Sequence, residues 1–207
     1  MRDPRLKLVG RGVGVALVAA VERVYLRRRA EPVGQARLTV GHVNMLGRAG
    51  DIRALTGSLR ENRPAVFVVL EPDAMLSSQL GDGVTGALHA VSPLSPGRHR
   101  LRDQQLAAAG SWARAQPEPV VVLGDLNAVP WSAALHSLEH DAGLSSSSDG
   151  FGLQASWPSL AGFAGVPIDQ LLTSRDLTAT RRQTRSGFGS TRRSLWVELA
   201  FAAVVSD

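Results

Sequence analysis

The sequence predicts an α/β fold, because short apolar segments rich in β-branched residues alternate with segments of helical spacing. The clearest strand is Val120–Leu123, a fully apolar run that contains three valines. The clearest helix is Asp51–Asn62, in which Ile52, Leu55 and Leu59 recur at helical spacing. With 207 residues, 44% of them hydrophobic, the chain is long enough for one domain with a sizeable core.

The other predicted strands are short apolar runs bounded by polar or turn-forming residues. In chain order they are Leu38–Asn44, Ala65–Leu70, Leu88–Val91, Ile168–Thr173 and Leu195–Val204. Two further helices are predicted between them. Arg100–Ala115 has Leu101, Leu106 and Trp112 available for packing, and Ser132–His140 has Ser132 as its N-cap. Ser145–Gly152 is predicted to be a loop rich in serine and glycine.

The chain divides into a basic, partly apolar leader with a linker, residues 1–36, and a domain, residues 37–207. The leader contains the apolar run Gly12–Val21, which is shorter than the roughly 20 apolar residues that span a membrane. Three interpretations stay open: a segment similar to a signal peptide, a helix at a membrane surface and an ordinary packed helix. Glu31–Gly34 has the composition of a linker. The expected location is the cytoplasm or a membrane surface, with membrane contact through the leader.

The amino-acid composition excludes some kinds of functional site. The chain has no cysteine, which excludes disulfides, cysteine-based zinc sites and cysteine nucleophiles. Its formal net charge is +5, and Lys7 is the only lysine. The many arginines are suited to phosphate recognition. The alternative explanation is that the whole sequence, which is rich in Ala and Gly, prefers arginine to lysine. A nucleic-acid-binding module is an alternative, supported by a basic cluster that consists of Arg181, Arg182, Arg185, Arg192 and Arg193. Few aromatic residues stand between these arginines, which weakens this alternative.

Asp125 and Asn127 directly follow the Val120–Leu123 strand and Gly124, which is predicted to end it. Residues two apart in an extended segment point to the same side, and the carboxyl ends of strands are where open α/β sheets bind ligands. A carboxylate there suits a metal ion or a proton from water, and a carboxamide suits a phosphoryl oxygen. The alternative is an Asx turn after a core strand.

The segment from Gly124 to Ser132 resembles the GD-[FL]-N-x-x-P signature of the endonuclease/exonuclease/phosphatase superfamily. Four more segments resemble motifs of that family in the same order. Arg37–Asn44 is similar to its first strand, which ends in Asn, and Pro64–Glu71 is similar to its second strand, which ends in a metal-binding Glu. Leu88–Pro93 is similar to its strand with a His on the phosphate side, and Pro167–Ser174 is similar to its I-D-H-x-L-x-S strand. The resemblance extends from about residue 37 to residue 203 and implies a two-sheet α/β sandwich.

The chain also departs from the family pattern. Gln170 stands where the I-D-H motif has His, and in the terminal S-D-H motif Thr191 replaces Asp and Arg192 replaces His. That terminal His is central to phosphoester cleavage in the family, whereas arginine stays protonated and does not act as a base. Between Glu71 and His89 the family has several strands, and this chain has only residues 72–88. The resemblance therefore implies a shortened sandwich that lacks several middle strands.

The resemblance implies a role for each matching residue. Glu71, with Asn44 beside it, would bind Mg²⁺ or Mn²⁺; a solvated strand end is the alternative for Glu71. Asp125 would orient or deprotonate water, and Asn127 would hold the phosphate. His89 would contact a phosphoryl oxygen or the leaving group, or simply be a hydrogen-bonded histidine at a strand edge.

Asp169 would lie near the missing terminal His, and a structural salt bridge with an arginine is its alternative role. Arg192 is a candidate to bind phosphate. The remaining histidines match no motif and are expected at the surface or in packing: His42, His99, His136 and His140.

The leading hypothesis is a divalent-metal-dependent phosphoester hydrolase, a nuclease or phosphatase, whose substrate is a nucleic acid, a lipid headgroup or a small phosphoester. Its activity is expected to be weak or absent, because Thr191 and Arg192 replace the terminal Asp-His pair. The alternative is a non-catalytic relative that binds a phosphorylated ligand or nucleic acid.

Overall fold

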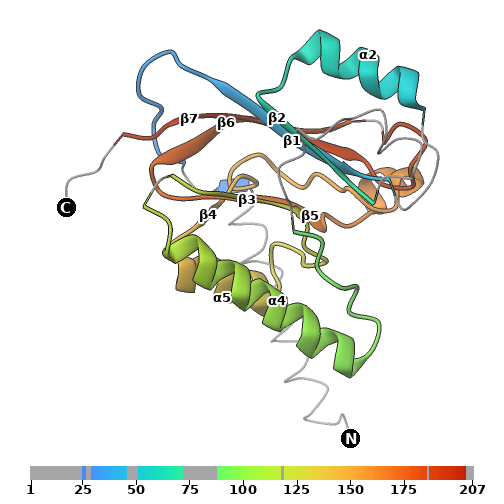
Figure 1. Cartoon of the computed structure of the whole chain (residues 1–207), viewed down its shortest axis with the longest axis vertical. Coiled ribbons are helices and arrows are strands. Elements are labelled where there is room, and N and C mark those ends of the chain that lie inside the picture. Colours follow the sequence, from blue (N-terminus) through green and yellow to red (C-terminus); the bar gives the residue numbers. More distant parts are fainter. Residues whose placement is uncertain are drawn as a thin grey trace, which may run out of the picture.

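The computed structural model describes residues 25–26, 29–45, 51–71, 88–117, 119–185 and 187–203. In this part of the chain two β-sheets lie face to face, with helix α2 outside one sheet and helices α4 and α5 outside the other (Figure 1). The fold is thus the expected two-sheet α/β sandwich, in the shortened form that the sequence implied. The segment after Glu71 where middle strands were expected to be missing, residues 72–87, lies outside the described residues.

The larger sheet has four strands in the order β2-β1-β7-β6. β1 and β2 are parallel, whereas β7 is antiparallel to both β1 and β6. Their bounds are Leu38–Asn44 for β1, Val66–Leu70 for β2, Leu177–Arg185 for β6 and Ser194–Phe201 for β7.

The smaller sheet has three antiparallel strands in the order β3-β5-β4. These are Val121–Asp125 for β3, Ser145–Ser146 for β4 and Asp169–Thr173 for β5. The helices are α2, α4, α5 and a short 3₁₀ helix, which span Ile52–Asn62, Pro96–Arg114, Ala133–Ala142 and Ser159–Ala164.

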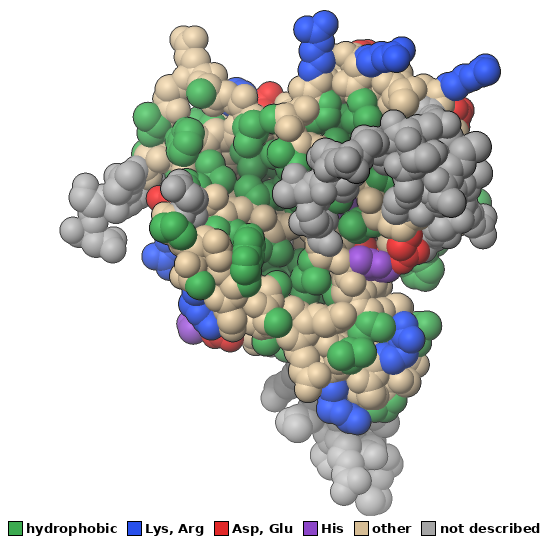
Figure 2. Space-filling model, viewed as in Figure 1, with side chains coloured by type: hydrophobic (Ala, Val, Ile, Leu, Met, Phe, Trp, Pro, Cys, Tyr) green, Lys and Arg blue, Asp and Glu red, His purple; other side chains and the backbone are tan. Residues whose placement is uncertain are grey.

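Apolar side chains form a buried cluster at each junction between layers. Val40 of β1 packs with Leu123 of β3 and Leu171 of β5 between the two sheets. Trp196 of β7 packs with Leu55 of α2 on the outer side of the larger sheet, and α4 and α5 cover the smaller sheet through a third cluster. Figure 2 shows hydrophobic side chains gathered between the layers and basic side chains projecting from the surface near α2.

One end of the sandwich brings the ends of several strands together. Asn44 ends β1 beside Leu70 of the parallel strand β2, so Glu71 follows at the same edge. In the smaller sheet Asp125, the last residue of β3, pairs with Asp169, the first residue of β5. β7 is antiparallel to β1, so its start lies near the end of β1. This topology explains why polar residues far apart in the sequence meet.

Most predicted elements are present, with four corrections. The predicted loop Ser145–Gly152 begins with a short strand, because Ser145–Ser146 pair with β5 as β4. Leu88–Val91 is not a ladder-forming strand; it runs beside β3 with hydrogen bonds from Leu88 N to Leu123 O (3.1 Å) and from Ala90 N to Asp125 O (2.9 Å). Gly124 does not end β3, which continues to Asp125. Gly124 has a φ of 145°, and a Cβ atom there would collide with the Leu88 carbonyl, so this glycine permits the close approach.

The fourth correction is β6, which the sequence did not predict, because the strand is rich in Thr and Arg and has few apolar residues. β6 lies at the edge of the larger sheet and pairs only with β7 among the described strands. An edge strand needs fewer apolar side chains than a central one, so the hydrophobic pattern was too weak to reveal it.

The predicted linker lies against the sandwich. Val33 N donates to Phe201 O and Ala203 N donates to Glu31 O, both at 2.8 Å, so this segment extends along the end of β7. The Gly12–Val21 run lies outside the described residues. Among the helices that the structure describes, none has both the length and the apolar character to cross a membrane.

Replacing Ser132 with alanine is expected to lower the free energy of unfolding by about 1 kcal/mol. Ser132 is the N-cap of α5, and its Oγ accepts a hydrogen bond from Leu135 N at 3.3 Å. Ser137→Ala, at an exposed position within the same helix, is the matched control and should change stability little. Urea unfolding measures both, and equal effects of the two substitutions would contradict the capping role.

Candidate active site

Four of the sequence-predicted residues, Asn44, Glu71, His89 and Asp125, come together at the end of the sandwich where strands of both sheets finish. β1 supplies Asn44, the end of β2 supplies Glu71, the segment beside β3 supplies His89, and β3 itself supplies Asp125. Figure 2 shows a histidine side chain against acidic side chains at the edge between the two layers.

His89 links the two acidic residues. Its Nδ1 lies 2.7 Å from Glu71 Oε1, and its Nε2 lies 3.6 Å from Asp125 Oδ2. Asn44 Nδ2 donates to Asp125 Oδ2 at 3.2 Å and lies 3.5 Å from His89 Nε2. Asp125 is fully buried, whereas the side chains of Glu71 and His89 are partly exposed, so the cluster opens to solvent on their side.

The Asp125 side chain forms the Asx-type turn that was the alternative interpretation of the sequence, and Asn127 also holds the neighbouring segment. Its backbone N–H donates to Asp125 Oδ1 at 3.1 Å, and its Nδ2 donates to Ala90 O at 2.8 Å. The buried Arg102 of α4 donates from Nη1 to Asn127 O at 2.6 Å. Asn127 (φ 46°) and Glu71 (φ 47°) both have left-handed backbone conformations, which are uncommon for residues other than glycine and are enriched at functional sites.

Asp169 and Arg192 complete the cluster. Arg192 Nη2 lies 2.8 Å from Asp125 Oδ2, and its Nη1 lies 4.0 Å from Asp169 Oδ2. At position 192 the neighbour of Asp169 is thus an arginine and not a histidine. This arrangement is the salt bridge that the sequence suggested as the alternative role of Asp169. Because Arg192 precedes β7 and both carboxylates belong to the smaller sheet, the guanidinium group joins the two sheets across the site.

His42 is a site residue that the sequence analysis placed only at the surface or in packing. It is fully buried on β1, and its Nε2 lies 3.8 Å from Asp169 Oδ1. Neither ring nitrogen makes a hydrogen bond with any described residue. The alternation of strand side chains could have revealed it, because His42 stands two residues before Asn44 and shares the inward face with Val40.

Arg182 of β6 is also buried beside the site. Its Nη1 donates to Ser147 Oγ at 2.8 Å and its Nη2 donates to Asp169 O at 3.4 Å. Burial lowers the pKa of Arg182 to about 10, so it stays charged at neutral pH. Arg182 and Arg192 are both buried, so the five arginines of the predicted nucleic-acid-binding cluster do not form one exposed patch.

Burial dominates the electrostatics. It raises the pKa of Asp125 to about 6, and the neighbouring charge of Asp169 acts in the same direction. Burial likewise raises the pKa of Asp169, with Ser156 and Arg192 acting against it. Burial lowers the pKa of His42 to about 3, so this imidazole is neutral at physiological pH.

Two side chains with oxygen atoms at this site, Glu71 and Asn44, are the ones that could hold a divalent ion. In the part of the chain that the structure describes, no group of three or more His, Cys, Asp or Glu side chains is arranged to hold a metal ion. Mg²⁺ often binds through only one or two carboxylates, with water and substrate phosphate completing its shell. Glu71 with Asn44 could bind an ion in that way, with Glu71 Oε1 lying 2.7 Å from His89 Nδ1, while Asp125 is paired with the Arg192 guanidinium.

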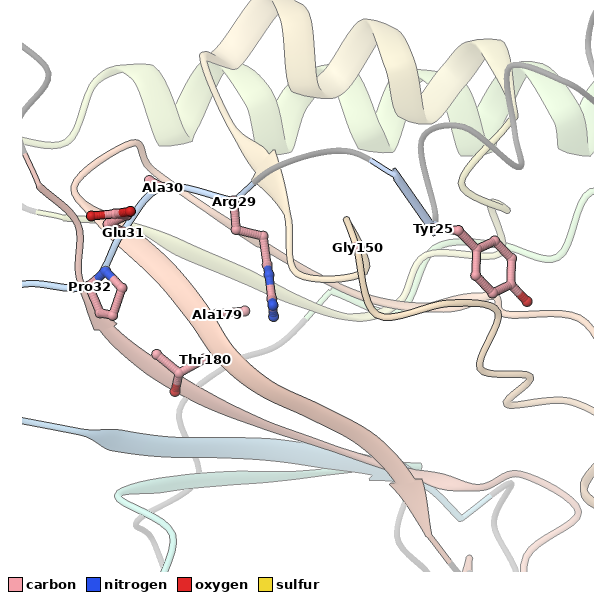
Figure 3. A pocket seen from close by; sticks show the side chains of 8 residues that line it. All are labelled: Tyr25, Arg29, Ala30, Glu31, Pro32, Gly150, Ala179 and Thr180. Atoms are coloured by element: carbon pink, nitrogen blue, oxygen red, sulfur yellow. The ribbon is translucent and has the colours of Figure 1, made fainter.

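A separate pocket of about 570 Å³ lies between the segment before β1, the turn at Gly150 and strand β6 (Figure 3). Arg29 points into it, and its guanidinium lies 3.9 Å from the centre of the Phe151 ring. None of the residues of the candidate active site lines this pocket, so the pocket is distinct from that site.

The fold and the clustered strand ends define an α/β sandwich with a polar site at one end. The model of the Endonuclease/Exonuclease/phosphatase family matches residues 14–207. The chain therefore belongs to that family, as the sequence motifs implied, and membership supports a phosphoester hydrolase, a nuclease or phosphatase, as its kind of function.

Solved structures support the fold. An endonuclease/exonuclease/phosphatase family protein from Bacteroides thetaiotaomicron is 11% identical with a TM-score of 0.63, over 84% of this chain and 100% of that one. A family member from Beutenbergia cavernae is 14% identical with a TM-score of 0.61, over 83% and 74%. A mannosyl-6-phosphatase from Bacteroides thetaiotaomicron is 11% identical with a TM-score of 0.56, over 79% and 100%. No curated protein matches the chain in sequence.

Proposed function

We propose that this protein is a slow phosphoester hydrolase that depends on Mg²⁺ or Mn²⁺. The observation that carries the proposal is the position of Asp125, buried at the end of β3 between Asn44, His89 and Arg192. A buried carboxylate with a raised pKa, in a cluster that opens to solvent, has the properties of a general base that works near neutral pH.

In this proposal the side chains around Asp125 bind the metal ion and the phosphate. Glu71 and Asn44 would hold the divalent ion, which when bound would neutralise charge on the phosphate oxygens. Asp125 would accept a proton from the attacking water. His89, between Glu71 and Asp125, would contact a phosphoryl oxygen or the leaving group, and Asn127 would help to hold the phosphate.

Arg192 accounts for the low rate that we propose. A guanidinium group stays protonated throughout the physiological range and neither accepts a proton nor supplies one to a leaving alkoxide. It does attract phosphate oxygens, for which its fork of N–H donors is well suited. A site that keeps charge stabilisation but lacks this proton transfer would be slower by a factor of about 100 to 10,000.

A second candidate function is binding of a phosphorylated ligand without hydrolysis. It is favoured by the 2.8 Å ion pair between Arg192 and Asp125, which occupies the carboxylate that would serve as the base. The two candidates differ in one observable, metal-dependent turnover by folded protein.

Asp125→Asn is expected to reduce turnover of bis(p-nitrophenyl) phosphate and p-nitrophenyl phosphate at least 100-fold, because the amide cannot take a proton from water. The measurement is release of p-nitrophenol with Mg²⁺, with Mn²⁺ and with EDTA. The matched control is Asp141→Asn, which removes an exposed carboxylate near the end of α5 and should leave the rate unchanged. Absence of metal-dependent turnover in folded wild-type protein would overturn the hydrolase and leave the binding protein.

A further inference from the structure

The pocket of about 570 Å³ between the segment before β1, the turn at Gly150 and strand β6 has walls that are tied to one another (Figure 3). Thr178 Oγ1 of β6 donates to Ala30 O at 2.9 Å, which holds the segment before β1 against the sheet. The Tyr25 ring lies against Gly152, where an added Cβ atom would come within 2.9 Å of it. Contacts within the protein thus set the shape of the pocket, which lowers the entropic cost of binding a ligand there.

Arg29 brings a positive charge into this pocket. Its side chain is exposed, so a ligand that enters from solvent reaches it. Its guanidinium lies over the Phe151 ring, which positions the charge but offers no acceptor oxygen. No residue that the structure describes accepts a hydrogen bond from this guanidinium, and Glu31, an acidic residue of the lining, forms no ion pair with it. The fork of N–H donors is therefore open to an oxyanion.

The sequence next to the pocket favours a phosphate as that oxyanion. Four arginines follow the apolar run Gly12–Val21 within seven residues: Arg23, Arg27, Arg28 and Arg29. A basic cluster beside an apolar segment attracts the phosphate groups of anionic lipids. Beside the pocket Tyr25 is 55% exposed and Leu26 is 72% exposed, and tyrosine is enriched where proteins meet lipid headgroups. The volume is in the range of pockets that hold small organic ligands, so it has room for more than a single ion.

We propose that this pocket binds a glycerophosphate group, carried either by an anionic phospholipid or by a soluble molecule, and that Arg29 is the residue that binds its phosphate. A guanidinium group donates to two phosphate oxygens at once, which gives such a contact both strength and orientation. The pocket is separate from the candidate active site, so this proposal does not depend on hydrolysis there.

The test measures binding by the full chain in EDTA, which removes any divalent ion that would support turnover. Co-sedimentation compares vesicles of phosphatidylglycerol and phosphatidylcholine in equal parts with vesicles of phosphatidylcholine alone, which give the baseline for insertion of apolar side chains. Calorimetry measures binding of sn-glycerol 3-phosphate in solution. Arg29→Gln should lower the binding above baseline at least about tenfold, and Arg29→Lys at least about threefold, because lysine keeps the charge and loses the planar fork.

Arg53→Gln, which removes an exposed arginine of α2, is the matched control and should leave both affinities unchanged. Arg29-dependent binding to vesicles alone would identify a lipid headgroup as the source of the phosphate, and Arg29-dependent binding of glycerol 3-phosphate would identify a soluble one. The proposal is overturned if neither probe binds above baseline or if binding persists in folded Arg29→Gln. It is also overturned if Arg29→Lys binds as tightly as the wild-type chain, because diffuse attraction by charge would then explain the binding.

Discussion

Arg192→Met is expected to lower the free energy of unfolding by about 3–5 kcal/mol at pH 8, because it leaves buried carboxylates without their cation. The guanidinium lies 2.8 Å from Asp125 Oδ2 and 4.0 Å from Asp169 Oδ2, and all three side chains are less than one-tenth exposed. Methionine keeps a similar length of aliphatic chain, so the loss is one of charge and hydrogen bonding. Guanidinium chloride unfolding measures it.

The loss should be smaller at pH 5 than at pH 8. The pKa of Asp125 in the folded protein is raised to about 6 from a usual value of 3.8, and removing Arg192 raises it further. At this carboxyl the folded variant therefore binds more protons than the unfolded chain in this range, so the contribution of Asp125 to stability is fully present below pH 4 and is lost as pH rises through 6. Arg193→Met, at the adjacent and less buried arginine, is the control and should change stability by less than about 0.5 kcal/mol. A loss that does not depend on pH would contradict the ionic origin.

The double substitution Thr191→Asp with Arg192→His is expected to raise turnover about 100- to 10,000-fold. It restores the terminal Asp-His pair that the family pattern has and this chain lacks. The introduced histidine would replace a permanently charged group beside Asp125 with one that takes up and releases protons near neutral pH. The measurement is release of p-nitrophenol from the diester and the monoester, with circular dichroism to establish that the variant folds.

Thr191→Asn with Arg192→Gln is the matched control, because it removes the same guanidinium without supplying a titratable group. Its turnover should stay at or below that of the wild-type chain. A folded Asp-His variant no faster than this control would show that the missing proton transfer is not what limits the rate.

The arrangement at Arg192 illustrates how a family site can change while its frame persists. The ends of β1 and β3, together with the segment beside β3, still bring Asn44, Asp125 and His89 to one place, because the apolar pattern of β1 and β3 and the pairing of β3 with β5 are intact. The group delivered by the segment before β7 differs in chemistry, as does Gln170 of β5. The guanidinium makes a contact between the two sheets that stabilises the site and at the same time occupies its carboxylate.

Residues of the candidate site were found from the sequence where local patterns signalled them. Asn44, Glu71 and Asp125 each stand at the end of an apolar strand, and strand ends are recognisable from composition. The family motifs supplied the order of the segments. The resemblance to the family implied the two-sheet architecture; β1, β2, β3, β5 and β7 lie in segments that match family motifs, whereas β4 and β6 do not.

Other residues became apparent only in three dimensions. His42 looked unremarkable because a histidine within an apolar strand carries no motif, and its meeting with Asp169 depends on the packing of one sheet on the other. The cation–π contact between Arg192 and Trp157 likewise joins residues that are far apart in the chain. β6 was not predicted from the sequence because an edge strand needs few apolar side chains.

By itself the sequence determined the α/β class, the order of the motifs and the loss of the terminal Asp-His pair, because these depend on residue identity and on local hydrophobic pattern. Tertiary structure alone decided that Arg192 pairs with Asp125, that Arg182 is buried and that Asp169 lies against His42. These contacts join strands from different sheets and distant segments, so their distances, burial and pKa shifts arise only when the sandwich closes.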